Sequence, residues 1–60
     1  MNENSQTVLE EMKHQNVSLT TLGVSLGMFE FSLKKRLERG LTNAETQQIL
    51  SILKGGKENE

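Results

Sequence analysis

The sequence contains no cysteine, proline, tryptophan or tyrosine. Without cysteine, neither a disulfide framework nor a thiolate zinc site can stabilise the fold, and the composition suits a reducing cytoplasm. The apolar runs are only a few residues long and the first residues, 1–6, are polar, so we expect neither a membrane span nor a secretory signal. With 60 residues, of which 33% are hydrophobic, the chain has room for one small domain.

Catalytic side chains are also scarce. The chain has one histidine, lacks cysteine, aspartate and tyrosine, and is too short to enclose a pocket, so we do not expect an enzyme. His14 is the only candidate base, and Glu10 and Glu11 precede it by four and three residues. That spacing permits a weak surface metal site but favours solvated pairing along a helix. The glycines match no phosphate-binding loop, and no motif predicts a cofactor or a metal.

Positive charge is concentrated in one segment of the chain. Seven lysines and arginines stand against eight glutamates, a net charge of −1, which is poor for a protein that binds nucleic acid over its whole surface. Residues 31–40, however, carry four of the cations and only one glutamate, Glu38. Any affinity for nucleic acid is therefore expected to reside in this segment.

The spacing of apolar residues predicts helices. Leucine, isoleucine, valine and methionine supply most of the apolar side chains, and they recur at helical rather than alternating intervals. Breaks at Asn16, Gly27 and Gly40 divide the chain into short segments. We predict an all-α protein, a small bundle of about four or five helices over residues 1–54, with a disordered polar tail at 55–60.

Capping residues predict where these helices begin. Thr7 and Glu10 form a capping-box pattern that would start a first helix over residues 7–15, and Thr42 with Glu45 form a second one before the last helix. Between them, Ser18 is a plausible cap for a short second helix that ends at a glycine. The third helix, residues 29–39, has leucines four apart, cations on its other faces and no Ser, Thr, Asp or Asn cap.

Two short helices joined by a glycine turn, the second carrying cations, meet the geometric requirements of a helix-turn-helix. The run from Val17 to Met28 resembles the front half of that motif in phage repressors and Cro-like regulators, the XRE-type family. The positions that carry the resemblance are Leu22, Gly23, Leu26, Gly27, Met28, Leu33 and Leu37. The family has an apolar residue where this chain has Arg36, so Leu37 must supply that packing.

The resemblance implies a lambda-repressor-like bundle that regulates transcription by occupying a double-stranded DNA operator, with helix 29–39 in the major groove. The implied base contacts are Phe29, Glu30, Phe31, Ser32 and Lys35, and the implied phosphate contacts are Ser18, Thr20, Lys34, Arg36 and Arg39. One such module makes few contacts, so we expect a homodimer on a two-fold operator, paired through the last helix.

Simpler interpretations accompany these assignments. The four cations are equally compatible with a solvated helix face near a C-terminus. Phe29 lies four residues before Leu33 and eight before Leu37, a spacing that favours the core over a DNA contact. Phe31 lies off that stripe, and an exposed phenylalanine is better suited to a protein partner. The alternative function is therefore an antirepressor-like module that binds another regulator through Phe29 and Phe31.

Overall fold

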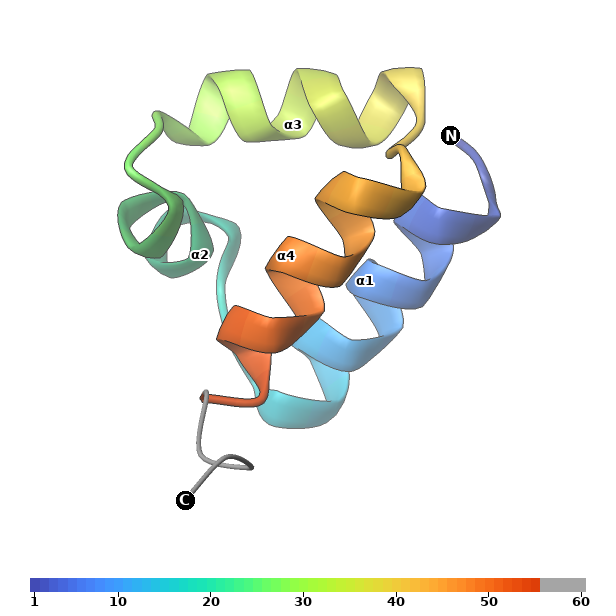
Figure 1. Cartoon of the computed structure of the whole chain (residues 1–60). Coiled ribbons are helices and arrows are strands. Elements are labelled where there is room, and N and C mark those ends of the chain that lie inside the picture. The colour runs from blue at the N-terminus through green and yellow to red at the C-terminus, as the bar shows by residue number, and fades with distance from the viewer. Residues whose placement is uncertain (56–60) are drawn as a thin grey trace.

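A computed structural model describes residues 1–55 of the chain, and in this part it contains helices and no strands. The helices are α1 (Glu3–Gln15), α2 (Leu19–Leu26), α3 (Glu30–Arg39) and α4 (Asn43–Leu53). Helices α1 and α4 lie side by side and run in the same direction, α3 crosses their N-terminal ends, and α2 packs against α3 (Figure 1). The predicted all-α bundle of about four helices is confirmed; most of the predicted tail lies outside the described residues.

The core draws apolar side chains from all four helices. The buried members are Val8, Met12, Leu22, Leu33, Leu37, Leu41, Ile49 and Leu53. Because each helix is short, each contributes only one or two of these side chains, and half-buried neighbours such as Leu26 and Met28 complete the packing. Among residues 1–55, no helix has the length and apolar character needed to cross a membrane.

The first helix begins earlier than its sequence pattern predicts. The expected start at Thr7 is wrong: α1 begins at Glu3, and the Asn2 side chain caps it by accepting the Ser5 backbone N–H at 2.9 Å. Thr7 therefore lies inside the helix, where its hydroxyl donates to the Glu3 carbonyl oxygen at 3.1 Å. Asparagine is as good a cap as threonine, and the earlier start adds a turn that buries Ser5.

That added turn ties α1 to the connection between α3 and α4. The Ser5 hydroxyl donates to the Leu37 carbonyl oxygen at 2.8 Å, and Asn2 Nδ2 donates to the Leu41 carbonyl oxygen at 2.9 Å. Asn4 Nδ2 donates to the same Leu41 oxygen at 3.1 Å. We call Asn2, Asn4 and Ser5 the α1 clamp; it fixes the C-terminal end of α3 against the rest of the bundle.

The turn between α2 and α3 follows the predicted pattern. Ser18 caps α2 by accepting the Thr21 backbone N–H at 3.1 Å, and Gly27 ends it with φ +72°, a left-handed conformation that favours glycine. A Cβ at Gly23 would lie 2.9 Å from the Met28 carbonyl oxygen, so only glycine allows α2 and the turn to approach this closely. Glycine at positions 23 and 27 thus determines how α3 is positioned relative to α2.

The expectation that Phe29 belongs to the core is wrong. Its side chain is 82% exposed. Phe29 is the N-cap residue of α3, with extended backbone angles, so the helical spacing that relates it to Leu33 and Leu37 does not apply to it. Met28, one residue earlier, packs against the core in its place.

The last helix begins as predicted. Thr42 Oγ1 accepts the Glu45 backbone N–H at 3.1 Å, and Glu45 Oε1 accepts the Thr42 backbone N–H at 2.9 Å, a complete capping box. Just before it, Gly40 has φ +109° and would bring a Cβ within 2.9 Å of the Asn2 side chain. Glycine at this position is therefore needed both for the backbone conformation and for the α1 clamp.

Candidate functional site

Helix α3 is buried along one narrow stripe and open on the rest of its surface. Of its side chains only Leu33 and Leu37 are buried. At 100° per residue, the direction opposite these two leucines is occupied by Phe31, Ser32, Lys35 and Arg39, all of them exposed, and the exposed Glu38 lies as close to it as Ser32. We call Phe31, Ser32, Lys35 and Arg39 the outer face of α3. It combines hydrogen-bond donors and positive charge with one aromatic ring, and the negative charge of Glu38 lies beside it.

Two members of the outer face contact each other. Lys35 Nζ lies 5.3 Å from the centroid of the Phe31 ring, within the range of a cation–π interaction. Phe31 is nevertheless 69% exposed, as its position off the apolar stripe predicts. The ring supports the lysine over one turn of helix and leaves both side chains open to a ligand.

A second exposed apolar surface lies where α2 meets the turn. Val24 is 76% exposed and Phe29 82%, and together with Gly27 and Met28 they line a shallow open hollow of about 270 Å³. We call Val24, Met28 and Phe29 the apolar patch. Exposed phenylalanine and valine side chains so close together are the kind of surface that binds a partner.

Several of the predicted contact residues already have partners within the chain. Thr20 Oγ1 donates to Glu30 Oε1 at 2.7 Å, so the first turn of α3 is tied to the start of α2. The Ser18 hydroxyl is used in capping α2 and in a 2.9 Å hydrogen bond to Thr21 Oγ1. Lys34 is exposed on the flank of α3. Of the predicted base contacts, Ser32 and Lys35 are the polar side chains best placed on the outer face.

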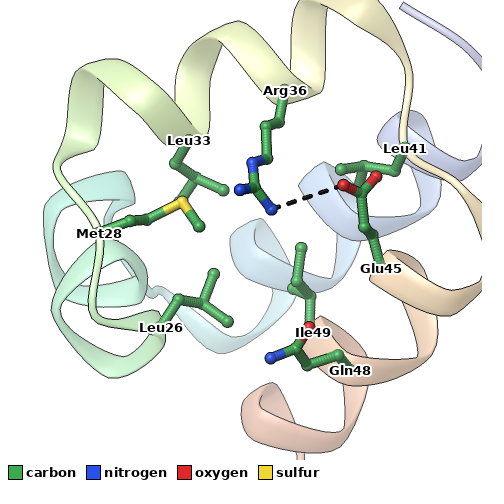
Figure 2. A pocket seen from close by; sticks show the side chains of 8 residues that line it. All are labelled: Leu26, Met28, Leu33, Arg36, Leu41, Glu45, Gln48 and Ile49. Carbon is green, nitrogen blue, oxygen red and sulfur yellow. Dashed lines mark hydrogen bonds and ion pairs between the residues drawn. The ribbon is translucent and has the colours of Figure 1, made fainter.

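The two arginines of α3 share one carboxylate of α4. Arg39 Nη2 lies 3.0 Å from Glu45 Oε2 and 3.1 Å from Oε1, and Arg36 Nη1 lies 3.5 Å from Oε2. Figure 2 shows Arg36 extending from α3 toward Glu45 across the space between the two helices. Both arginine side chains remain about half exposed, at 48% and 52%. The family resemblance implies phosphate contacts for these two arginines, and the sequence gives no sign of their shared partner.

The Glu45 carboxylate is held in its charged form. The Thr42 backbone N–H hydrogen bond lowers the pKa of this carboxyl most, partial desolvation opposes that effect, and Arg39 lowers the pKa further through a hydrogen bond and its charge.

The ion pair between Arg36 and Glu45 covers a small cavity of about 60 Å³ between α2, α3 and α4, lined by side chains such as Met28 and Ile49 (Figure 2). A cavity of this size holds little more than water.

The residues that carry the family resemblance lie in α2, in the turn that follows it and on the bundle side of α3. Leu22, Gly23, Leu33 and Leu37 are buried, Leu26 and Met28 are half-buried, and Gly27 occupies the turn. The α1 clamp was missed, although Asn2 followed by Glu3 is a recognisable helix start. No local signal reveals that Glu45 faces Arg36 and Arg39, because that contact depends on how α4 packs.

The spacing of Glu10, Glu11 and His14 on α1 permits a weak metal site but favours solvated pairing along the helix. Glu11 Oε2 accepts a hydrogen bond from Gln15 Nε2 on the next turn of the helix. In residues 1–55, no group of three or more histidine, cysteine, aspartate or glutamate side chains is arranged to hold a metal ion. His14 is exposed near the end of α1. Glu11 and His14 both lie on α1, apart from the outer face of α3.

Comparison of the chain with protein-family models, with curated proteins and with solved structures found no match. Function must therefore be inferred from the geometry of α2 and α3 and from the residues they display.

Proposed function

We propose that this chain binds double-stranded DNA and acts as a transcriptional regulator of the phage or mobile-element type, with α3 in the major groove. The observation that carries the proposal is that α3 is buried only through Leu33 and Leu37, so a whole helix face is free to enter a groove. The segment with most of the positive charge coincides with this helix. The resemblance to Cro-like regulators, which act in the cytoplasm on operators, points the same way.

The proposed contacts divide by chemistry. Lys35 and Ser32 on the outer face can donate to base edges, and the Phe31 ring can pack on a thymine methyl group. Lys34 neutralises phosphates beside the groove, and Arg39 can do so only in competition with its ion pair to Glu45. Glu30 lies nearer the leucine side of α3 than the outer face, and its Oε1 accepts a hydrogen bond from Thr20, so it is poorly placed to reach a cytosine. The main candidates for sequence-specific contacts are therefore Ser32 and Lys35.

Binding as a pair gives such a small module useful affinity. One helix reads only a few base pairs, whereas two copies on a two-fold operator double the contacts. We propose a homodimer with α4 as its interface. The half-buried Leu50 lies on α4 beside exposed polar residues. Analytical ultracentrifugation with and without operator DNA measures the association directly.

The decisive experiment is fluorescence anisotropy with labelled duplexes from the region upstream of the chain's own gene, at two salt concentrations, with an unrelated duplex as control. An operator-binding regulator should prefer its own region by about a thousandfold or more, with affinity falling as salt rises. Lys35→Ala should cost about 1 to 3 kcal/mol at the specific site only. Lys34→Ala should weaken all duplexes alike and reduce the salt slope by about one.

A second function is favoured by one observation, the exposure of Phe29 and Phe31. In this alternative the chain binds another regulator, as an antirepressor does, with the two rings as anchors and the cations around them as a polar rim. A folded sample that binds no duplex at low salt would support it. Phe31→Ala separates the two functions further, because it should abolish regulator binding and only weaken DNA binding.

A further inference from the structure

The ion pair between α3 and α4 places a fixed anion beside the proposed DNA-binding helix. Glu45 is the capping-box residue of α4, so its carboxylate is held in position by the Thr42 backbone N–H as well as by the arginines. Its side chain is only 22% exposed, whereas Arg36 and Arg39 are about half exposed. The anion is thus more fixed than the cations that it binds.

Charge and geometry together determine what this anion does. Arg39 belongs to the outer face of α3, yet one of its terminal nitrogens lies within 3.1 Å of both Glu45 oxygens. Arg36 shares the same carboxylate at 3.5 Å. Two cations therefore face one resident anion, and the group as a whole offers DNA a single positive charge instead of two.

We propose that Glu45 is a resident competitor that withholds Arg36 and Arg39 from DNA phosphates and so lowers the affinity of the chain for DNA of any sequence. This inference rests on the proposed DNA-binding function. Phosphate contacts occur on every duplex, whereas base contacts occur only on the correct one. Because the phosphate contacts are reduced on an operator and on other DNA alike, Glu45 lowers both affinities by about the same factor, and a duplex that lacks the base contacts of Ser32 and Lys35 keeps little affinity.

The other charges around α3 have no comparable arrangement. Glu30 Oε1 accepts a hydrogen bond from Thr20, Lys35 lies over the Phe31 ring, and Glu38 is exposed on α3; none of the three takes part in an ion pair within residues 1–55. Within the described residues, both ion pairs that the structure contains end on Glu45. The effect on non-specific binding is therefore assigned to this one side chain.

The test is the salt dependence of binding to an unrelated, mixed-sequence duplex, measured by anisotropy for the full chain and for Glu45→Gln. Glutamine can still accept the Thr42 backbone N–H, so the capping box and the fold should persist, which a thermal unfolding curve verifies. Releasing one positive charge should steepen the salt slope by about 0.9 and tighten non-specific binding about eightfold at 0.1 M salt. Binding to an operator should tighten by about the same factor, because the released arginines contact phosphates on any duplex.

Glu10→Gln is the matched control, because it removes the same charge from an exposed position on α1. It should change the slope far less than Glu45→Gln. The second control repeats Glu45→Gln in a chain that already carries Arg36→Ala and Arg39→Ala. There the substitution should have no more effect than Glu10→Gln, because the cations that it would release are gone.

Each remaining outcome counts against the inference. If the unsubstituted chain binds DNA and Glu45→Gln behaves like Glu10→Gln, Glu45 withholds nothing, and the proposed function stands without it. If Glu45→Gln steepens the slope even without the two arginines, the carboxylate repels DNA directly and the competition is refuted. If neither the unsubstituted chain nor Glu45→Gln binds any duplex at low salt, the proposed function and the inference fall together.

Discussion

The polar groups on the two sides of α3 differ in whether they are hydrogen-bonded within the chain. On the side facing the bundle, the α1 clamp engages its hydroxyl and amide groups with the backbone around Leu41, and in residues 1–55 no buried side-chain nitrogen or oxygen lacks a partner. On the outer face, Ser32 and Lys35 make no hydrogen bond within the described part of the chain.

The difference separates residues that build the fold from residues that are free to bind. Polar groups that are buried must be satisfied within the chain, because leaving one unpaired costs about 1 to 3 kcal/mol. Polar groups on an exposed helix face carry no such requirement. The α1 clamp is therefore structural, and substitutions there should alter stability, whereas substitutions of Ser32 or Lys35 on the outer face should alter binding alone.

The largest effect on stability is expected at Gly23, where α2 approaches the turn before α3. Gly23→Leu would place a Cβ 2.9 Å from the Met28 carbonyl oxygen and a larger side chain beyond it. Overpacking of this kind costs about 1 to 3 kcal/mol or more, a large share of the roughly 3 to 9 kcal/mol expected for a chain of this size. Circular dichroism should show an unfolded chain or a sharply lowered thermal midpoint; an unchanged midpoint would refute the close approach.

Gly40→Ala tests the clamp side and should have the next largest effect. Its φ of +109° is unfavourable for alanine, and the new Cβ would also lie 2.9 Å from the Asn2 side chain. Strain of this kind costs about 1 to 3 kcal/mol, measured by urea unfolding. Combining it with Asn2→Ala separates the two causes, because the steric part of the loss should disappear in the double variant while the backbone part remains.

Ser5→Ala should cost somewhat less, about 1 to 2 kcal/mol, because it leaves the buried Leu37 carbonyl oxygen without its hydroxyl donor. Ser25→Ala is the matched control, since Ser25 is exposed on α2 and should be neutral. Equal urea midpoints for the two variants would show that the clamp contributes nothing to stability.

Local signals account for the parts of this structure that the sequence predicts. The capping box at Thr42, the cap at Ser18 and the turn at Gly27 each depend on a few adjacent residues, and all three are confirmed. The spacing of Leu33 and Leu37 likewise identifies the buried stripe of α3, because both residues lie well inside the helix.

The remaining features depend on contacts that no local pattern records. Thr7 has a valid capping pattern, yet Asn2 starts α1 because it also binds Leu41 across the fold. Counting helical turns from Leu33 places Phe29 in the core, and the count fails because α3 has not yet begun at that residue. For the candidate site, the exposure of Lys35 could be predicted from the leucine stripe, whereas the Glu45 ion pairs could not.

Acid should weaken the connection between α3 and α4 that Glu45 provides. Because the folded chain holds the pKa of the Glu45 carboxyl below its usual value, this stabilisation is fully present above the usual value of about 4.5 and is lost as the pH falls through the lowered pKa. Urea unfolding from pH 6 down to pH 3 should therefore show a smaller acid loss for Glu45→Gln than for the unsubstituted chain. Equal losses would show that Glu45 titrates alike in both states.

The smallest effect, and one of opposite sign, is expected at the boundary between the two regions. Phe29 occupies the N-cap position of α3 without any side-chain cap, and its ring is exposed. Phe29→Ser should therefore raise the free energy of unfolding by about 0.5 to 1 kcal/mol, because serine can accept a free backbone N–H at the start of the helix. Phe29→Ala is the control, since it removes the ring without adding a cap and should be neutral.

The sign of that change bears on function. If Phe29→Ser stabilises the chain, then position 29 holds a side chain that is worse for the fold than a common alternative, as residues retained for binding often are. The apolar patch would then belong with the outer face as binding surface, and the same variant should weaken binding to DNA or to a regulator. If both Phe29→Ser and Phe29→Ala destabilise the chain, the ring packs on Val24 and Met28 for stability, and the patch belongs with the clamp.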